Sequence, residues 1–156
     1  MEIQLLAIGT RMPGWVNDGF DDYTKRFGRD CKLTVREISS PRKSRTEDAQ
    51  RIVFQEGQQL LAAVPKDSYL VALDPRGKQH TTEAISKKLD DWFQHYRTVS
   101  LMIGGADGLS ADCLAASREQ WSLSKLTFPH ALVRVIAAEQ LYRAYSMLKN
   151  HPYHRG

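Results

Sequence analysis

The sequence predicts an α/β fold with a mainly parallel sheet and helices on both faces. Two observations support this prediction. Short apolar runs typical of strands alternate with longer stretches of helical periodicity along the whole chain. Turns that contain glycine or proline separate many of these segments. The 156 residues show no internal repeat and no linker long enough to divide them, so we expect one domain spanning residues 1–156.

The first third of the chain predicts a strand, a helix and a second strand. The apolar run at residues 3–8 is a buried strand, and it is broken at residues 9–13. Pro13 suits the first turn of a helix. The residues that then recur at helical spacing are Trp15, Val16, Phe20, Tyr23 and Phe27. The second strand is marked by Leu33, Val35 and Ile38, although its alternation is less regular.

The middle of the chain begins with a basic, polar stretch at residues 39–45 that contains a proline and predicts a flexible loop. A helix is expected to open near Thr46 and Asp48 and to end near Ala63, with buried positions at Ile52, Leu60 and Leu61. Residues 69–74 form the third strand, which Pro75 and Gly77 are expected to stop.

The last part continues the alternation. Residues 81–83 cap a helix that reaches about residue 96, and residues 99–103 form the fourth strand. Ser110 caps a short helix through Ala116. Residues 121–128 hold a short apolar strand and a loop, and the longest helix follows from His130 to about Asn150.

Composition limits the class of protein. Lys and Arg total 22 and Asp and Glu total 18, a mild excess that permits an anionic partner without requiring one. Cys31 and Cys113 form no CxxC pair, so we expect no metal site and two reduced cysteines. The N-terminus lacks the features of a signal peptide, and no run approaches the roughly 20 apolar residues that span a bilayer. We expect a cytoplasmic protein that does not enter a membrane.

Two predicted strands end in turns where an α/β sheet binds ligands, at residues 73–77 and 103–110. The second turn has consecutive glycines, Gly104 and Gly105, followed by Gly108. This GGxxG pattern lacks the spacing of the GxGxxG dinucleotide motif and the Lys of a phosphate loop. It therefore suits a nucleoside ligand without phosphate, such as S-adenosylmethionine. A tight turn with no ligand is the alternative when this motif is taken alone.

Taken together, several segments resemble one family. They are residues 101–110 (LMIGGADGLS), 121–130 (WSLSKLTFPH), 134–144 (RVIAAEQLYRA) and 150–155 (NHPYHR), with residues 6–16 and 73–78 in addition. In this order the set resembles the ribosomal RNA large-subunit methyltransferase H family of the SPOUT class, over essentially the whole chain.

This resemblance implies a C-terminal part tied in a deep trefoil knot, which residue spacing alone could not have suggested. It implies a homodimer that uses S-adenosylmethionine to methylate N3 of a pseudouridine in helix 69 of 23S ribosomal RNA, on the assembled ribosome. The donor would be held by residues in three segments, namely Leu73, Gly104, Gly105, Leu123, Ser124, Lys125, Leu126, Thr127 and Phe128. The apolar walls around adenine would be Leu73, Ile103, Leu123, Leu126 and Phe128.

The resemblance assigns the acceptor side to the C-terminal tail. His154 would act as a base or hydrogen-bond partner, Arg155 would hold a phosphate or the developing anion, and Tyr153 would stack on a base. The alternative is a chain end without a role. On the last helix, Glu139 is expected to pair with Arg143 at i,i+4.

Three further residues in the loop after the second strand, Arg42, Lys43 and Arg45, are expected either to grip RNA phosphates or to form a solvated surface. Two other functions stay open. A related knotted methyltransferase with another RNA target would keep the donor segments but need different acceptor residues. A non-enzymatic RNA or ribosome-assembly factor would bind no methyl donor.

Overall fold

The computed structural model describes residues 1–44, 46 and 48–155, and in this part of the chain strands and helices alternate as predicted. The strands are β1 (Glu2–Ile8), β2 (Lys32–Ile38), β3 (Tyr69–Gln79), β4 (Thr98–Ile103) and β5 (Glu119–Ser122). The helices are α1 (Gly14–Thr24), α2 (Ala49–Ala63), α3 (Thr82–His95), α4 (Ala111–Ala116) and α5 (His130–Leu148), followed by a 3-10 turn, η1 (Pro152–Arg155).

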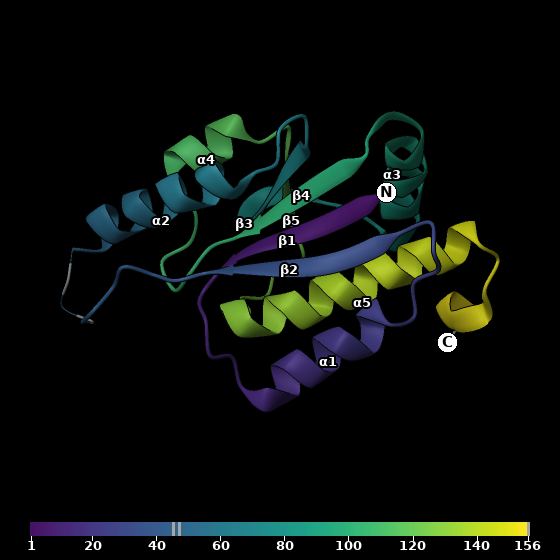
Figure 1. Cartoon of the computed structure of the whole chain (residues 1–156), viewed down its shortest axis with the longest axis horizontal. Helices are drawn as coiled ribbons and strands as arrows, with labels where there is room; N and C mark the ends of the chain where they lie inside the picture. Colours follow the sequence, from purple (N-terminus) through teal and green to yellow (C-terminus); the bar gives the residue numbers. More distant parts are fainter. Residues whose placement is uncertain (45, 47, 156) are drawn as a thin grey trace.

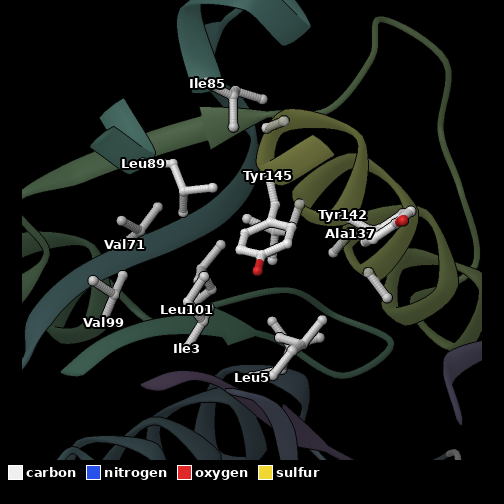
Figure 2. Close-up of a cluster of buried hydrophobic side chains, with 14 of the residues drawn as sticks. Ile3, Leu5, Val71, Ile85, Leu89, Val99, Leu101, Ala137, Tyr142 and Tyr145 are labelled. Atoms are coloured by element: carbon white, nitrogen blue, oxygen red, sulfur yellow. The ribbon is translucent and has the colours of Figure 1, made fainter. Parts of the chain in front are cut away.

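The strands form one parallel sheet in the order β2-β1-β4-β3-β5, with helices on both faces (Figure 1). Helices α1, α3 and α5 cover one face, where their apolar side chains pack on those of the strands. Figure 2 shows part of this core, with Leu5 and Leu101 from the sheet near Tyr145 of α5. Helices α2 and α4 cover the other face over Leu6 and Met102. Alternate strand residues therefore point to opposite layers.

Three predicted helix starts are confirmed by their caps. The Asp48 carboxylate accepts a hydrogen bond from the amide of Gln50 at 3.0 Å. The hydroxyls of Thr81 and Ser110 accept from amides three residues later, at 3.1 and 3.2 Å. These side chains replace the backbone partners that the first turn of a helix lacks.

The third strand is longer than predicted, because β3 continues through Pro75 to Gln79. Its pairing with β5 shifts there, so that both Leu73 and Lys78 lie opposite Trp121 and residues 74–77 bulge outward. Pro75 is tolerated because it lies in this unpaired bulge. Gly77 allows the close approach to β5, since a Cβ at this position would lie 2.5 Å from the carbonyl of Gln120.

Two smaller features of the described chain differ from simple helical periodicity. Helix α1 ends at Thr24, and Phe27 lies beyond it, where its ring packs against Tyr142 and Tyr145 of α5. Leu61 is half-buried rather than buried. The cysteines Cys31 and Cys113 are buried and not joined in a disulfide. No helix among the described residues is both long enough and apolar enough to cross a membrane.

Candidate functional site

A cavity of about 810 Å³ opens at the carboxyl end of the sheet. Three segments that are distant in sequence form it: the end of β3 with its bulge, the turn after β4, and the loop between β5 and α5. The first turn of α5 closes one side with His130 and Val133. Ligands of open α/β sheets bind at this edge, so the cavity is the candidate site.

The glycine turn is packed so tightly that only glycine fits at its start. A Cβ on Gly104 would lie 2.5 Å from the carbonyl carbon of Gly108, and a Cβ on Gly105 would lie 3.1 Å from a carboxylate oxygen of Glu56. Gly108 has a φ of +83°, a conformation that favours glycine. The turn therefore presents its backbone to the cavity.

The loop after β5 forms the opposite wall and is shaped by local hydrogen bonds. The Ser122 hydroxyl donates to the carbonyl of Ser124 at 2.9 Å, and the Ser124 hydroxyl accepts from the amide of Leu126 at 2.9 Å. These bonds hold the loop in a compact turn although Leu126 itself is 72% exposed.

The structure brings the predicted donor residues together, with one exception. The residues of this set that line the cavity are Leu73, Gly104, Gly105, Leu123, Ser124, Leu126, Thr127 and Phe128. Lys125 is exposed and is not among the lining residues. Ile103 also lines the cavity, so all five residues that were predicted as apolar walls around adenine do so. That these residues bind a methyl donor stays a prediction.

Trp121 is a buried wall of the cavity that the residue pattern did not single out. Its indole stacks on Trp92 of α3, with ring centroids 5.7 Å apart and planes 8° apart. The indole N–H donates to Glu119 at 3.1 Å. Glu119 in turn accepts from Tyr69 at 2.5 Å and pairs with Lys88 at 2.8 Å. These contacts fix the ring before any ligand arrives.

Asp74 and Arg76 bring charge to the cavity from the β3 bulge. The buried Asp74 carboxylate accepts from the amide of Arg76 at 2.8 Å and from its Nε at 3.1 Å. Burial alone would raise the pKa of Asp74, but the bonds and positive charge of Arg76 outweigh it and hold that pKa below its usual range. The carboxylate is therefore ionised at neutral pH.

The sequence offered partial signals for these additional cavity residues. Asp74 ends the predicted third strand, and Val133 follows His130 at i+3 on the helix start, so both positions could have been inferred from element ends. The position of Trp121 could not have been inferred in this way. It depends on the pairing of β5 with β3 across the bulge, where the sequence predicted that the third strand ends.

The predicted acceptor residues lie apart from the cavity in the single chain. None of Tyr153, His154 and Arg155, which are described in η1, lines it. Tyr153 packs beside Tyr142 and Glu139, and His154 Nδ1 lies 3.4 Å from the Ser146 hydroxyl. At about 1.5 Å of rise per residue, these α5 positions are about 14 to 24 Å along the helix from His130. Figure 1 shows the tail beyond the far end of α5.

Tyr153 sits in a polar and aromatic cluster. Its hydroxyl oxygen lies 3.4 Å from the Tyr23 hydroxyl and 3.3 Å from the Glu139 carboxylate, and the Arg143 guanidinium lies 4.8 Å from its ring centroid. Burial, together with Tyr23 and the negative charge of Glu139, raises the pKa of Tyr153 well above its ordinary value. The phenol is therefore neutral at physiological pH.

The two arginines of α5 have different surroundings. The predicted pair of Arg143 with Glu139 is confirmed at 3.1 Å. Arg134 is buried, donates to the Gly9 carbonyl at 2.7 Å and pairs with Glu37 at 2.5 Å. It therefore fixes the start of α5 against the ends of β1 and β2. Among the described residues, no group of His, Cys, Asp or Glu is arranged to hold a metal ion.

The family described as "Predicted SPOUT methyltransferase" matches residues 1–154. Two solved structures share the fold: a probable methylase family protein from Haemophilus influenzae, with a TM-score of 0.56 and 12% identity, and TrmJ from Z. mobilis, with a TM-score of 0.54 and 15% identity. They are matched over 97% and 92% of this chain and 69% and 70% of their own. Together the fold and the family match define the class, and the chain is a SPOUT methyltransferase.

Curated relatives narrow this class. Proteins named ribosomal RNA large subunit methyltransferase H from Methylococcus capsulatus and Coxiella burnetii are each 48% identical over 155 residues, which cover 99% of this chain and 100% of theirs. The protein of that name from Thioalkalivibrio sulfidiphilus is 47% identical over 99% of both chains. The chain therefore belongs to the ribosomal RNA large subunit methyltransferase H family.

Proposed function

We propose that this protein transfers a methyl group from S-adenosylmethionine to ribosomal RNA of the large subunit. The observation that carries the proposal is the cavity of about 810 Å³, which the glycine turn and residues 123–128 form together. Its volume lies in the range of small-molecule sites. The substrate class comes from the relatives at 47% and 48% identity, which are named as methyltransferases of large-subunit ribosomal RNA.

The residues present fit this donor. Apolar side chains on both sides, from Leu73 and Ile103 to Leu123 and Phe128, suit the flat adenine ring. Backbone groups of the glycine turn offer hydrogen bonds to a nucleoside without crowding it. Asp74 is ionised but paired with Arg76, so the two residues bring a charged pair without net charge to the cavity. When bound, S-adenosylmethionine would supply a methyl group on a sulfonium.

We further propose that the acceptor is N3 of a pseudouridine in helix 69 of 23S ribosomal RNA, within the assembled ribosome in the cytoplasm. Methylation of an imino nitrogen requires removal of its proton and stabilisation of the negative charge that develops. His154 is suited to the first task and Arg155 to the second. Tyr153, which stays neutral, is suited to stacking on a base rather than to taking a proton.

The separation of tail and cavity favours a homodimer. Because the tail packs along α5 at a distance from the cavity, it does not reach a donor bound in its own chain in this conformation. A second copy could place its tail over the first copy's cavity, and a symmetric pair would then form two shared sites. We therefore propose that each site combines the cavity of one protomer with the tail of its partner.

A methylation assay tests the function. The protein, labelled S-adenosylmethionine and ribosomes from cells that lack the protein should yield one methyl group per large subunit, on a pseudouridine located by mass spectrometry of RNA fragments. Free 23S RNA should be a poorer substrate than the ribosome. Donor binding with the labelled methyl group on another nucleotide would favour a related methyltransferase with a different target. Absence of donor binding in calorimetry would contradict the proposed methyltransferase activity.

A further inference from the structure

The loop between β2 and α2 contacts the glycine turn directly through Arg42 and indirectly through Glu56 of α2. Residues 40–44 of this loop are here called the basic loop. The Arg42 guanidinium forms an ion pair with the Asp107 carboxylate, and Asp107 lines the cavity. The Ser40 hydroxyl donates to Glu56 at 2.5 Å, and Glu56 lies directly beneath Gly105. The loop is thus attached to a residue of the turn that lines the cavity.

Arg42 is also ordered by its own loop. Its amide donates to the Ser40 hydroxyl at 3.2 Å, and its guanidinium donates to the Ser44 carbonyl at 3.4 Å. Its side chain is only 23% exposed, although the segment is polar and at the surface. A cation that contacts phosphates from solvent would have its guanidinium directed outward, whereas this one is directed at a carboxylate of the turn. Arg45, the third cation of this stretch, lies outside the described residues.

We propose that Arg42 is a positioning residue of the donor cavity, which fixes the glycine turn through Asp107. The proposal rests on the function proposed above, since the ligand of the cavity is taken to be S-adenosylmethionine. Gly104, Gly105 and Gly108 give this turn more conformational freedom than other residues would. Arg42 restrains that freedom from one side and the buried Glu56 from below. A restrained turn loses less entropy when the donor binds.

This assignment changes the expectation for the basic loop. If Arg42 only gripped RNA phosphates, its removal would weaken ribosome binding and leave donor affinity unchanged. Because it pairs with the cavity lining instead, removal of its charge should weaken donor binding. A partly exposed ion pair contributes modestly, so we expect the dissociation constant for S-adenosylmethionine to rise about threefold to fivefold.

Calorimetry with S-adenosylmethionine on the full-length protein and its Arg42→Ala, Asp107→Asn and double variants tests the proposal. Each single variant should bind about threefold to fivefold more weakly, and the double variant should bind no more weakly than either, because both changes break one interaction. The exchanged pair Arg42→Asp with Asp107→Arg should recover affinity. The matched control is Arg51→Ala, which removes the same charge from an exposed position on α2 and should bind like the wild type.

Three results would overturn the proposal: unchanged donor affinity in Arg42→Ala, an equal loss in Arg51→Ala, or additive losses in the double variant. Thermal unfolding of each variant shows whether the fold is kept, and the exposed Asp107→Asn change gives a second measure should Arg42→Ala fail to fold. If the wild-type protein itself binds no S-adenosylmethionine, the proposed function fails rather than the role of Arg42. Ribosome affinity should change less than donor affinity in Arg42→Ala, and the reverse would assign Arg42 to RNA.

Discussion

At the scale of single residues, the candidate site depends most on a position that has no side chain. Gly104 follows β4 directly and lies where the turn closes on itself, with the carbonyl group of Gly108 within 2.6 Å of any added Cβ. The sequence predicted a close backbone approach here from the two consecutive glycines. It could not show that the crowding comes from the turn itself, because that depends on how Gly108 folds back.

Replacement of Gly104 by alanine should therefore weaken donor binding at least about tenfold, since the turn must move away from the new methyl group. It should also lower the free energy of unfolding by about 1–3 kcal/mol. Calorimetry with S-adenosylmethionine and urea denaturation measure the two effects. Gly14→Ala is the matched control, because a Cβ there has open space and should leave donor affinity unchanged. Wild-type affinity in Gly104→Ala would show that the turn does not contact the donor.

At the scale of elements, the short strand β5 is fastened to its neighbours by one carboxylate. Glu119 joins Tyr69 of β3, Lys88 of α3 and the indole of Trp121, which is a cavity wall. Burial alone would raise the pKa of Glu119, but the hydrogen bonds and the charge of Lys88 outweigh it and hold that pKa below its usual range. These side chains add to the backbone pairing with β3 that holds this four-residue strand at the edge of the sheet.

The lowered pKa predicts a pH dependence of stability. The ionised Glu119 contributes stability above about pH 4.5, and this contribution is lost as the pH falls through its lowered pKa. The Glu119→Gln protein should be less stable than the wild type at pH 7, and the difference in Tm should shrink as the pH is lowered from 7 to 3 and Glu119 takes up a proton. Thermal unfolding across this range measures it, with the exposed Asp90→Asn on α3 as control. A difference that stays constant down to pH 3 would contradict the ionic role.

The elements themselves were largely predictable, and the exceptions have physical causes. Caps at Asp48, Thr81 and Ser110 are local signals, and the structure has them where the sequence placed them. The continuation of β3 past Pro75 was not predictable, because a proline ends a strand unless a bulge frees it from pairing. The bulge depends on Gly77 and on a partner strand more than 40 residues later in the chain.

At the scale of the whole molecule, alternation predicted the parallel sheet and the two helical layers, but not the strand order. β1 lies inside the sheet between β2 and β4, and β5 lies at the edge next to β3. This order brings the turn after β4 and the loop after β5 to one cavity, and periodicity carries no information about it. The knot and the partner chain stay predictions from the family. The same sheet order and helical layers are compatible with a knotted and with an unknotted chain.

The shared site makes a prediction that only a dimer can fulfil. A protein truncated after residue 152 lacks the tail and should lose methylation while its affinity for S-adenosylmethionine stays near that of the wild type. The Gly104→Ala protein keeps its tail but should bind donor poorly, so it is nearly inactive at a donor concentration well below its dissociation constant. After the two inactive proteins are unfolded and refolded together, about half of the dimers should be mixed, and each mixed dimer holds one intact site. Methylation should therefore return to about a quarter of the wild-type rate, measured by label transfer to ribosomes at equal total protein.

Size-exclusion chromatography with light scattering should show twice the mass of one chain for every sample. If the mixture stays inactive while the mixed dimer is present, the tail acts within its own chain, and the separation of tail and cavity must then close by movement of the tail.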